Sequence, residues 1–160
     1  MAGGDILLAF GALGMDLQLA GGDLMADDSL LTAVVISLFT NRLAEPGDEL
    51  PAGETDRQGW WADTTLPALK TGGGKDRIGS RLWLLRREKQ LPSVLARAKE
   101  YAEESLAWLV SEGHVLAVSV AATNPARGVL LITVSLTRRQ GDLAWKLQYD
   151  ATNETYQLAE

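Results

Sequence analysis

The chain has 160 residues, of which 46% are hydrophobic and 22% are charged, a composition typical of one folded domain. It has no cysteine and one histidine, His114, which excludes disulfides, cysteine-bound metals and thiol nucleophiles and leaves little for a histidine-based triad. No apolar run reaches the ~18–20 residues that span a bilayer. The first basic residue is Arg42, too late for the cationic start of a secretory signal. We therefore expect a soluble protein that is not exported and binds no cofactor and no membrane.

The charged side chains are unevenly distributed along the sequence. Residues 1–69 hold two basic and eleven acidic side chains, whereas residues 70–89 hold seven basic and two acidic ones. The net charge of −6 repels nucleic acid at long range, so the basic block does not indicate a nucleic-acid-binding domain. The block can instead face solvent, pair with the acidic segment 45–63 of the same chain, or bind an acidic patch on a second protein.

The N-terminal part predicts a β-hairpin followed by a helix. Met15, Leu17 and Leu19 alternate with polar residues after the glycine-containing segment 11–14, which is typical of paired strands. A helix is expected from about Ser29, with Asp28 or Ser29 as its N-cap. Its expected buried face is Leu30, Leu31, Val34, Val35, Leu38 and Phe39, and its expected exposed face includes Thr32, Ser37 and Thr40.

Residues 41–75 form a long segment without helical or strand periodicity, rich in proline, glycine and carboxylates. A loop of this length inside a compact domain is usually functional or disordered. The adjacent pair Trp60 and Trp61 favours a functional loop, because two indoles need a surface on which to rest.

Two further helices and three strands are expected after this loop. The helices run from Arg77 to Lys89, capped by Asp76, and from Pro92 to about Ser111, ending at Gly113. Alternating apolar residues then predict a three-stranded antiparallel meander with two turns. The fold class is therefore α+β: an N-terminal β-hairpin and about three helices packed on one face of a C-terminal three-stranded antiparallel meander. We expect one domain over residues 1–150, with the loop at 41–75, and a C-terminal tail at 151–160.

The motifs that suggest enzymatic chemistry are weak. The run from Gly72 to Lys75 lacks the spacing and the Ser or Thr of a phosphate-binding loop, and a flexible linker explains it better. Acidic residues near Trp60 and Trp61 allow one alternative, a lysozyme-like hydrolase with paired carboxylates beside a tryptophan platform. The candidate acids are Glu45, Glu49, Glu54 and Asp63.

The sequence favours an assembly component over an enzyme. A meander has outer strands to which another chain can add a strand through main-chain hydrogen bonds. Lys146 and Gln148 lie on the last strand of the predicted meander, where such pairing is expected. The predicted partner interface consists of Glu45, Pro46, Trp60, Trp61, Asp63, Arg77, Arg81, Lys146 and Gln148, and no catalytic, cofactor-binding or metal-binding residue is expected.

Several stretches, in this order, resemble the gene-product-forty-six family of Mu-like phages. They are Gly22-Asp23-Leu24, Leu31-Thr32-Ala33-Val34, Ile36-Ser37-Leu38-Phe39-Thr40, Gly59-Trp60-Trp61-Ala62-Asp63, the run from Asp76 to Leu85, and Tyr101-Ala102-Glu103-Glu104. More remotely, the chain is similar to the small wedge protein of contractile-tail baseplates, which also occurs in type VI secretion baseplates.

The resemblance implies a structural wedge subunit, made in the host cytoplasm and located in the virion tail baseplate. Its implied partners are other wedge proteins and the sheath and tube proteins, with sheath assembly starting on its strands. Asp76, Arg77 and Arg81 stand at family-like positions. The broader wedge family carries a Glu-Pro-Arg-like motif, but here Glu45 and Pro46 are followed by Gly47, so the resemblance does not extend to that arginine.

Overall fold

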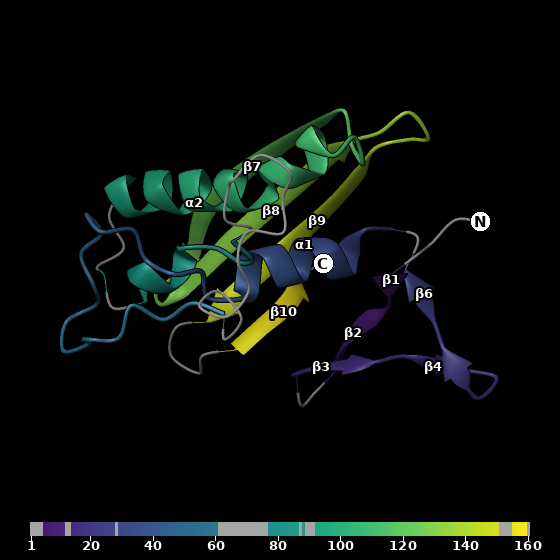
Figure 1. Ribbon diagram of the computed structural model, residues 1–160, viewed down its shortest axis with the longest axis horizontal. Helices are drawn as coiled ribbons and strands as arrows, with labels where there is room; N and C mark the ends of the chain where they lie inside the picture. The colour runs from purple at the N-terminus through teal and green to yellow at the C-terminus, as the bar shows by residue number, and fades with distance from the viewer. Residues whose placement is uncertain are drawn as a thin grey trace.

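The computed structural model describes residues 5–11, 14–27, 29–60, 77–86, 88, 92–150 and 155–159. The expected α+β class is confirmed: helices cover one face of an antiparallel sheet, and a β-rich N-terminal unit projects to one side (Figure 1). Among these residues, no helix combines the length and the apolar character needed to cross a bilayer.

The sheet has four strands in the order β10-β9-β8-β7. The three predicted strands are present as β7 (Ala117–Ala126), β8 (Val129–Thr137) and β9 (Leu143–Asp150). The expected number of three is wrong, because β10 (Thr155–Ala159) adds to β9 with Tyr156 opposite Tyr149. Stacking of these two rings, with centroids 4.8 Å apart, helps to hold the added strand.

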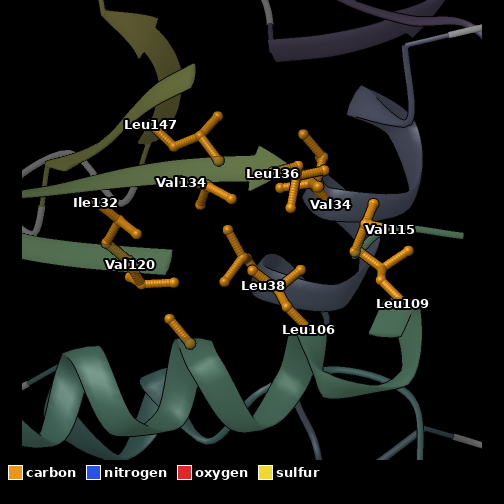
Figure 2. Packing of buried hydrophobic residues seen from close by; sticks show 12 residues of the cluster. Val34, Leu38, Leu106, Leu109, Val115, Val120, Ile132, Val134, Leu136 and Leu147 are labelled. Carbon is orange, nitrogen blue, oxygen red and sulfur yellow. The ribbon is translucent and has the colours of Figure 1, made fainter. Parts of the chain in front are cut away.

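Two α-helices cover the sheet. The helix α2 (Pro92–Ser111) has the predicted bounds, and Gly113 follows it at φ +78°, in the left-handed region that favours glycine at a helix end. The helix α1 (Leu31–Phe39) lies between α2 and the N-terminal unit. Apolar side chains of both helices and of β7, β8 and β9 form the main core, among them Val34, Leu38, Leu106, Leu109, Val120, Ile132, Val134, Leu136 and Leu147 (Figure 2).

The expected exposed face of α1 is partly wrong. Thr32 and Ser37 are buried, whereas Ile36 is 42% exposed. Both buried hydroxyls have hydrogen-bond partners: Thr32 Oγ1 donates to the Ile6 carbonyl, and Ser37 Oγ accepts from Trp108 Nε1 at 3.0 Å. Contacts with the N-terminal unit and with α2 therefore cover polar positions that periodicity alone assigns to solvent.

The predicted helix over 77–89 is wrong in the described residues, which hold one turn of 3-10 helix, η2 (Leu82–Leu85). Gly79 has φ +96°, and Ser80 forms an isolated parallel bridge with Asn41. A backbone that extends to bridge another segment cannot at the same time form helical hydrogen bonds. Among the described residues, two α-helices and one 3-10 turn stand in place of the expected three helices.

The N-terminal unit, residues 5–27, contains the predicted hairpin and two further strand pairs. The hairpin is β2 (Leu8–Gly11) with β3 (Gly14–Leu17). The others are β1 (Asp5–Ile6) with β6 (Ala26–Asp27) and β4 (Leu19–Ala20) with β5 (Asp23–Leu24). The three pairs meet where Leu7 N–H donates to Met25 O, Gln18 N–H to Leu7 O, and Met25 N–H to Gln18 O, at 2.8, 3.1 and 2.9 Å.

Candidate functional site

The side chain of Arg81 lies at the centre of a cluster of charges between the loop 41–60, η2 and α2. Its guanidinium donates to Asp48 Oδ1 at 2.9 Å and to Glu104 Oε2 at 3.0 Å, and it lies 4.5 Å from the centre of the Tyr101 ring. Burial alone would lower the pKa of Arg81, but its hydrogen bonds to Glu104 and Asp48 raise it above the ordinary value. This arginine therefore stays charged and joins the acidic loop to α2.

Two further ion pairs extend the cluster. Arg42 contacts Glu104 at 3.2 Å, and Arg77 forms a salt bridge with Glu45. The guanidinium of Arg57 also donates to the backbone carbonyl of Glu45. Arg77 and Arg81 thus have acidic partners within the chain, which is one of the three roles open to the basic block.

The backbone at Gly79 and Ser80 brings these charges together. Ser80 N–H donates to Thr40 O at 2.9 Å, and Arg42 N–H donates to Ser80 O at 3.0 Å. A Cβ atom at Gly79 would lie 2.2 Å from the Thr40 carbonyl oxygen, so this close approach requires glycine. The bridge places Arg77 and Arg81 beside the start of the acidic loop.

The indole of Trp83 packs beneath the start of the loop 41–60, on the side of the core. It is 3% exposed, and its Nε1 donates to the backbone carbonyl of Arg42 at 2.8 Å. Around it a second, smaller core packs against the loop. The loop 41–60 is therefore held by charges outside and by an aromatic side chain inside.

The structure brings some of the predicted interface residues together and separates others. Glu45, Arg77 and Arg81 meet in the charge cluster, with Pro46 exposed next to Glu45 and Trp60 half-buried at the end of the described loop. Trp61 and Asp63 lie outside the described residues, as do Asp76 and the glycine run 72–74 with Lys75.

Lys146 and Gln148 belong to β9, in the sheet. Each alternates with a core residue, Leu147, so both point to the face away from the helices. Lys146 pairs in register with Thr133 on β8 and Ala159 on β10. The expectation that β9 is an outer strand is therefore wrong, and the edges among the described strands are β7 and β10.

Sequence analysis missed Asp48, Glu104, Arg42 and Tyr101 as members of the charge cluster. Asp48 is 33 positions and Glu104 is 23 positions from Arg81, so no helical or strand spacing relates them. A single sequence offers one signal, which is that a basic segment in an acidic chain needs acidic side chains nearby. This signal does not identify which acidic residues they are.

A cavity of about 640 Å³ opens between the end of α1, η2 and the sheet. Aromatic and aliphatic side chains dominate its wall, and the one carboxylate among the described lining residues, Glu88, forms an ion pair with Arg97. Among the described residues, no group of three or more His, Cys, Asp or Glu side chains could hold a metal ion. The cavity wall includes Phe39, Leu82, Trp83, Leu130, Tyr149 and Tyr156.

The loop acids of the hydrolase alternative have partners or stand alone. Glu45 pairs with Arg77, Glu54 accepts a hydrogen bond of 3.1 Å from Gln58, and Glu49 is exposed. None of these three lines the cavity, and Asp63 is not described. These three acids thus do not face each other across the cavity, as the two acids of glycoside hydrolysis would need to do.

Comparison with known proteins gives consistent matches. The family model described as phage protein GP46 matches residues 30–143. The chain is 46% identical over 129 residues to the baseplate protein gp46 of Escherichia phage Mu, covering 80% of this chain and 83% of that protein. It is 40% identical over 126 residues to the Mu-like prophage FluMu protein gp46 of Haemophilus influenzae, covering 79% and 81%.

Proposed function

The chain belongs to the GP46 family of phage proteins, and on this premise we propose that it is a structural subunit of the baseplate of a Mu-like contractile tail. Its similarity to the Mu baseplate protein over most of both chains carries the proposal. The chain is made in the host cytoplasm and becomes part of the virion tail baseplate.

A non-enzymatic role agrees with the chemistry of the described residues. The loop acids Glu45 and Asp48 form salt bridges with arginines of their own chain, so their role is to stabilise the fold rather than to act on a substrate. The cavity wall is mostly apolar and aromatic. Purified protein incubated with peptidoglycan between about pH 4 and 8 should release no reducing ends; release would support the hydrolase alternative.

In more detail, we propose a wedge subunit that links the baseplate to the tube and sheath and begins sheath assembly by strand addition at β7. Residues 117–123 of β7 pair regularly with β8 on one side, and β7 is an edge among the described strands. The ten residues of β7 include no charged side chain. Natural edge strands usually carry charges that block pairing, so an uncharged edge suits an incoming strand.

Two substitutions on β7 test strand addition. The experiment uses a bacterial strain that produces the phage but lacks the gene for this chain. The wild-type chain supplied in trans should restore tails with full sheaths. Ser119→Lys combined with Ala121→Lys should leave baseplates without sheaths in electron micrographs, because charges on an edge strand block pairing. The matched control places the same charges on the same face of the inner strands, Ser135→Lys on β8 with Ala144→Lys on β9, and should restore sheaths.

The outcomes separate the two levels of the proposal. Normal tails from the deletion strain without any supplied chain would contradict a baseplate role altogether. Full sheaths on tails that contain the β7 variant would leave the baseplate role standing and contradict strand addition at this edge.

A further inference from the structure

Exposed apolar side chains are concentrated in the N-terminal unit. Of the ten large hydrophobic residues exposed in the described part of the chain, six belong to residues 5–27. Leu19 is 68% exposed and Leu17 is 51% exposed. An apolar cluster of this kind on a folded surface usually marks a binding site. The six are Ile6, Met15, Leu17, Leu19, Leu24 and Met25.

The unit that carries these side chains is anchored to the domain. Thr32 Oγ1, on α1, donates to Ile6 O at 2.9 Å and accepts from Leu8 N–H at 3.1 Å. The carboxylate of Asp27 accepts from the backbone N–H of Thr32 at 2.7 Å. The apolar surface is therefore held in place before any partner arrives, which lowers the entropic cost of binding.

Strand pairing gathers the leucines and separates them from the acids. Leu19 lies directly opposite Leu24, so both point to one face, whereas Asp23 is opposite Ala20 and points to the other. In the hairpin, Leu17 is opposite Leu8, and Asp16 is opposite Ala9. Each of these two strand pairs, or arms, of the unit thus has an apolar face and an acidic face.

The charge of the unit specifies its partner further. No lysine or arginine occurs before Arg42, so the carboxylates of this region, among them Asp16 and Asp23, have no basic neighbour in sequence. Two copies of such a surface repel each other, which disfavours self-association through it. A partner that offers an apolar patch to one face of the unit and basic side chains to the other complements it.

We propose that the N-terminal unit docks onto a neighbouring baseplate protein, which covers the apolar face with an apolar patch and reaches the acidic face with lysine and arginine side chains. The identity of the neighbour as a baseplate protein rests on the proposed function. The docking surface is separate from the β7 edge, and it precedes the region matched by the family model, which begins at residue 30.

Photo-crosslinking in assembled tails tests the contact. The deletion strain is supplied with the full chain carrying p-benzoylphenylalanine in place of Leu19, or, as a control, in place of Leu116, which is 55% exposed outside the unit. We expect position 19 to crosslink to another tail protein, at an apolar peptide flanked by lysine or arginine, and position 116 not to reach that peptide.

Each other result overturns the inference in a recognisable way. A crosslink from position 19 to a second copy of this chain, or to an acidic peptide, would contradict the proposed partner. Tails that contain the chain but give no product at position 19 would contradict docking by this face. Absence of the chain from purified tails would instead contradict the proposed function.

Substitutions separate the apolar and electrostatic contributions. Leu17→Asp with Leu19→Asp should lower the amount of chain in purified tails by at least about tenfold, whereas Leu116→Asp should change it less than about twofold. Asp16→Lys with Asp23→Lys keeps the leucines and should also lower incorporation, while Asp142→Lys, in the β8–β9 turn, should not. Unchanged incorporation of both unit variants would overturn the proposal; thermal unfolding of each purified variant checks its fold.

Discussion

The carboxylate of Asp27 accepts a hydrogen bond of 2.7 Å from the backbone N–H of Thr32 and so joins the N-terminal unit to the first turn of α1. Asp27 also accepts hydrogen bonds from the backbone and the hydroxyl of Ser29. It is 4% exposed, and it shares the capping role expected of Ser29, whose Oγ accepts a hydrogen bond of 3.3 Å from the backbone N–H of Leu31; the alternative cap, Asp28, lies outside the described residues. This side chain thus satisfies the Thr32 N–H, a donor that the helix itself leaves unpaired.

Asp27→Ala should lower the free energy of unfolding by about 1–2 kcal/mol at neutral pH, because it removes this cap. Urea unfolding followed by circular dichroism measures the change. The control is Asp23→Ala, an exposed aspartate whose carboxylate contacts the neighbouring Leu24 N–H, with an expected effect within about 0.5 kcal/mol. Equal effects of the two substitutions would contradict the capping role.

Acidification should remove the contribution of Asp27. Burial alone would raise the pKa of Asp27, but hydrogen bonds from Ser29 and Thr32 outweigh it and hold the pKa below the ordinary value of 3.8. The folded chain therefore binds fewer protons than the unfolded chain in this range, and stability falls as the pH falls below about 4. The stability difference between the wild type and Asp27→Ala should shrink between about pH 6 and pH 3; a constant difference would contradict the pKa shift.

Gly79→Ala should lower the free energy of unfolding by an amount on the order of 3 kcal/mol. The added methyl group would overlap the Thr40 carbonyl, and φ +96° strains any other residue. Gly47→Ala is the matched control, since a Cβ there meets nothing within 4 Å, and it should change stability by less than about 0.5 kcal/mol. Chemical denaturation measures the free energy of unfolding of both variants. If Gly79→Ala lowers it no more than Gly47→Ala does, the close approach of Gly79 to Thr40 is contradicted.

Arg81→Lys should cost about 1–3 kcal/mol although it keeps the charge. A lysine cannot donate to Asp48 and Glu104 with the same fork and loses the stacking on Tyr101. Lys99→Ala, which breaks an exposed pair with Glu103 at 3.7 Å, serves as the control and should stay within about 0.5 kcal/mol. If both variants unfold at the same urea concentration, Arg81 does not organise the cluster.

Trp83→Phe should lower stability by about 1–3 kcal/mol, because the Arg42 carbonyl loses its buried donor and the smaller ring leaves a gap. Trp145→Phe, at a half-buried indole on β9, should cost less than about 1 kcal/mol. Thermal unfolding of the two variants compares them directly. The reverse order would mean that the indole hydrogen bond contributes little.

The elements predicted well from the sequence are those whose burial follows a simple period. In β8, Ile132, Val134 and Leu136 alternate with outward residues, and α2 begins at a proline and ends before a glycine. Such patterns depend on one face and one neighbouring layer. The hairpin of β2 and β3 is equally local, because only two positions of the sequence separate its paired strands.

The elements predicted poorly depend on contacts between distant segments. Residues 77–86 have a helical pattern of apolar side chains, but the bridge from Ser80 to Asn41 determines their backbone. The strand β10 is five residues long and is stabilised by Tyr156, whose ring lies 4.1 Å from that of Phe39. Neither contact leaves a periodic signal, and the same holds for the partners of Arg81.

The junction of the three strand pairs in the N-terminal unit has a kinetic consequence. Leu7, Gln18 and Met25 each connect two of the strand pairs, and the amide of each is bonded to the carbonyl of another of the three, so the three hydrogen bonds form a closed cycle. Opening any arm releases a donor or an acceptor in the other two. The amide protons of these three residues should therefore exchange with deuterium with a common protection factor, as one cooperative opening event.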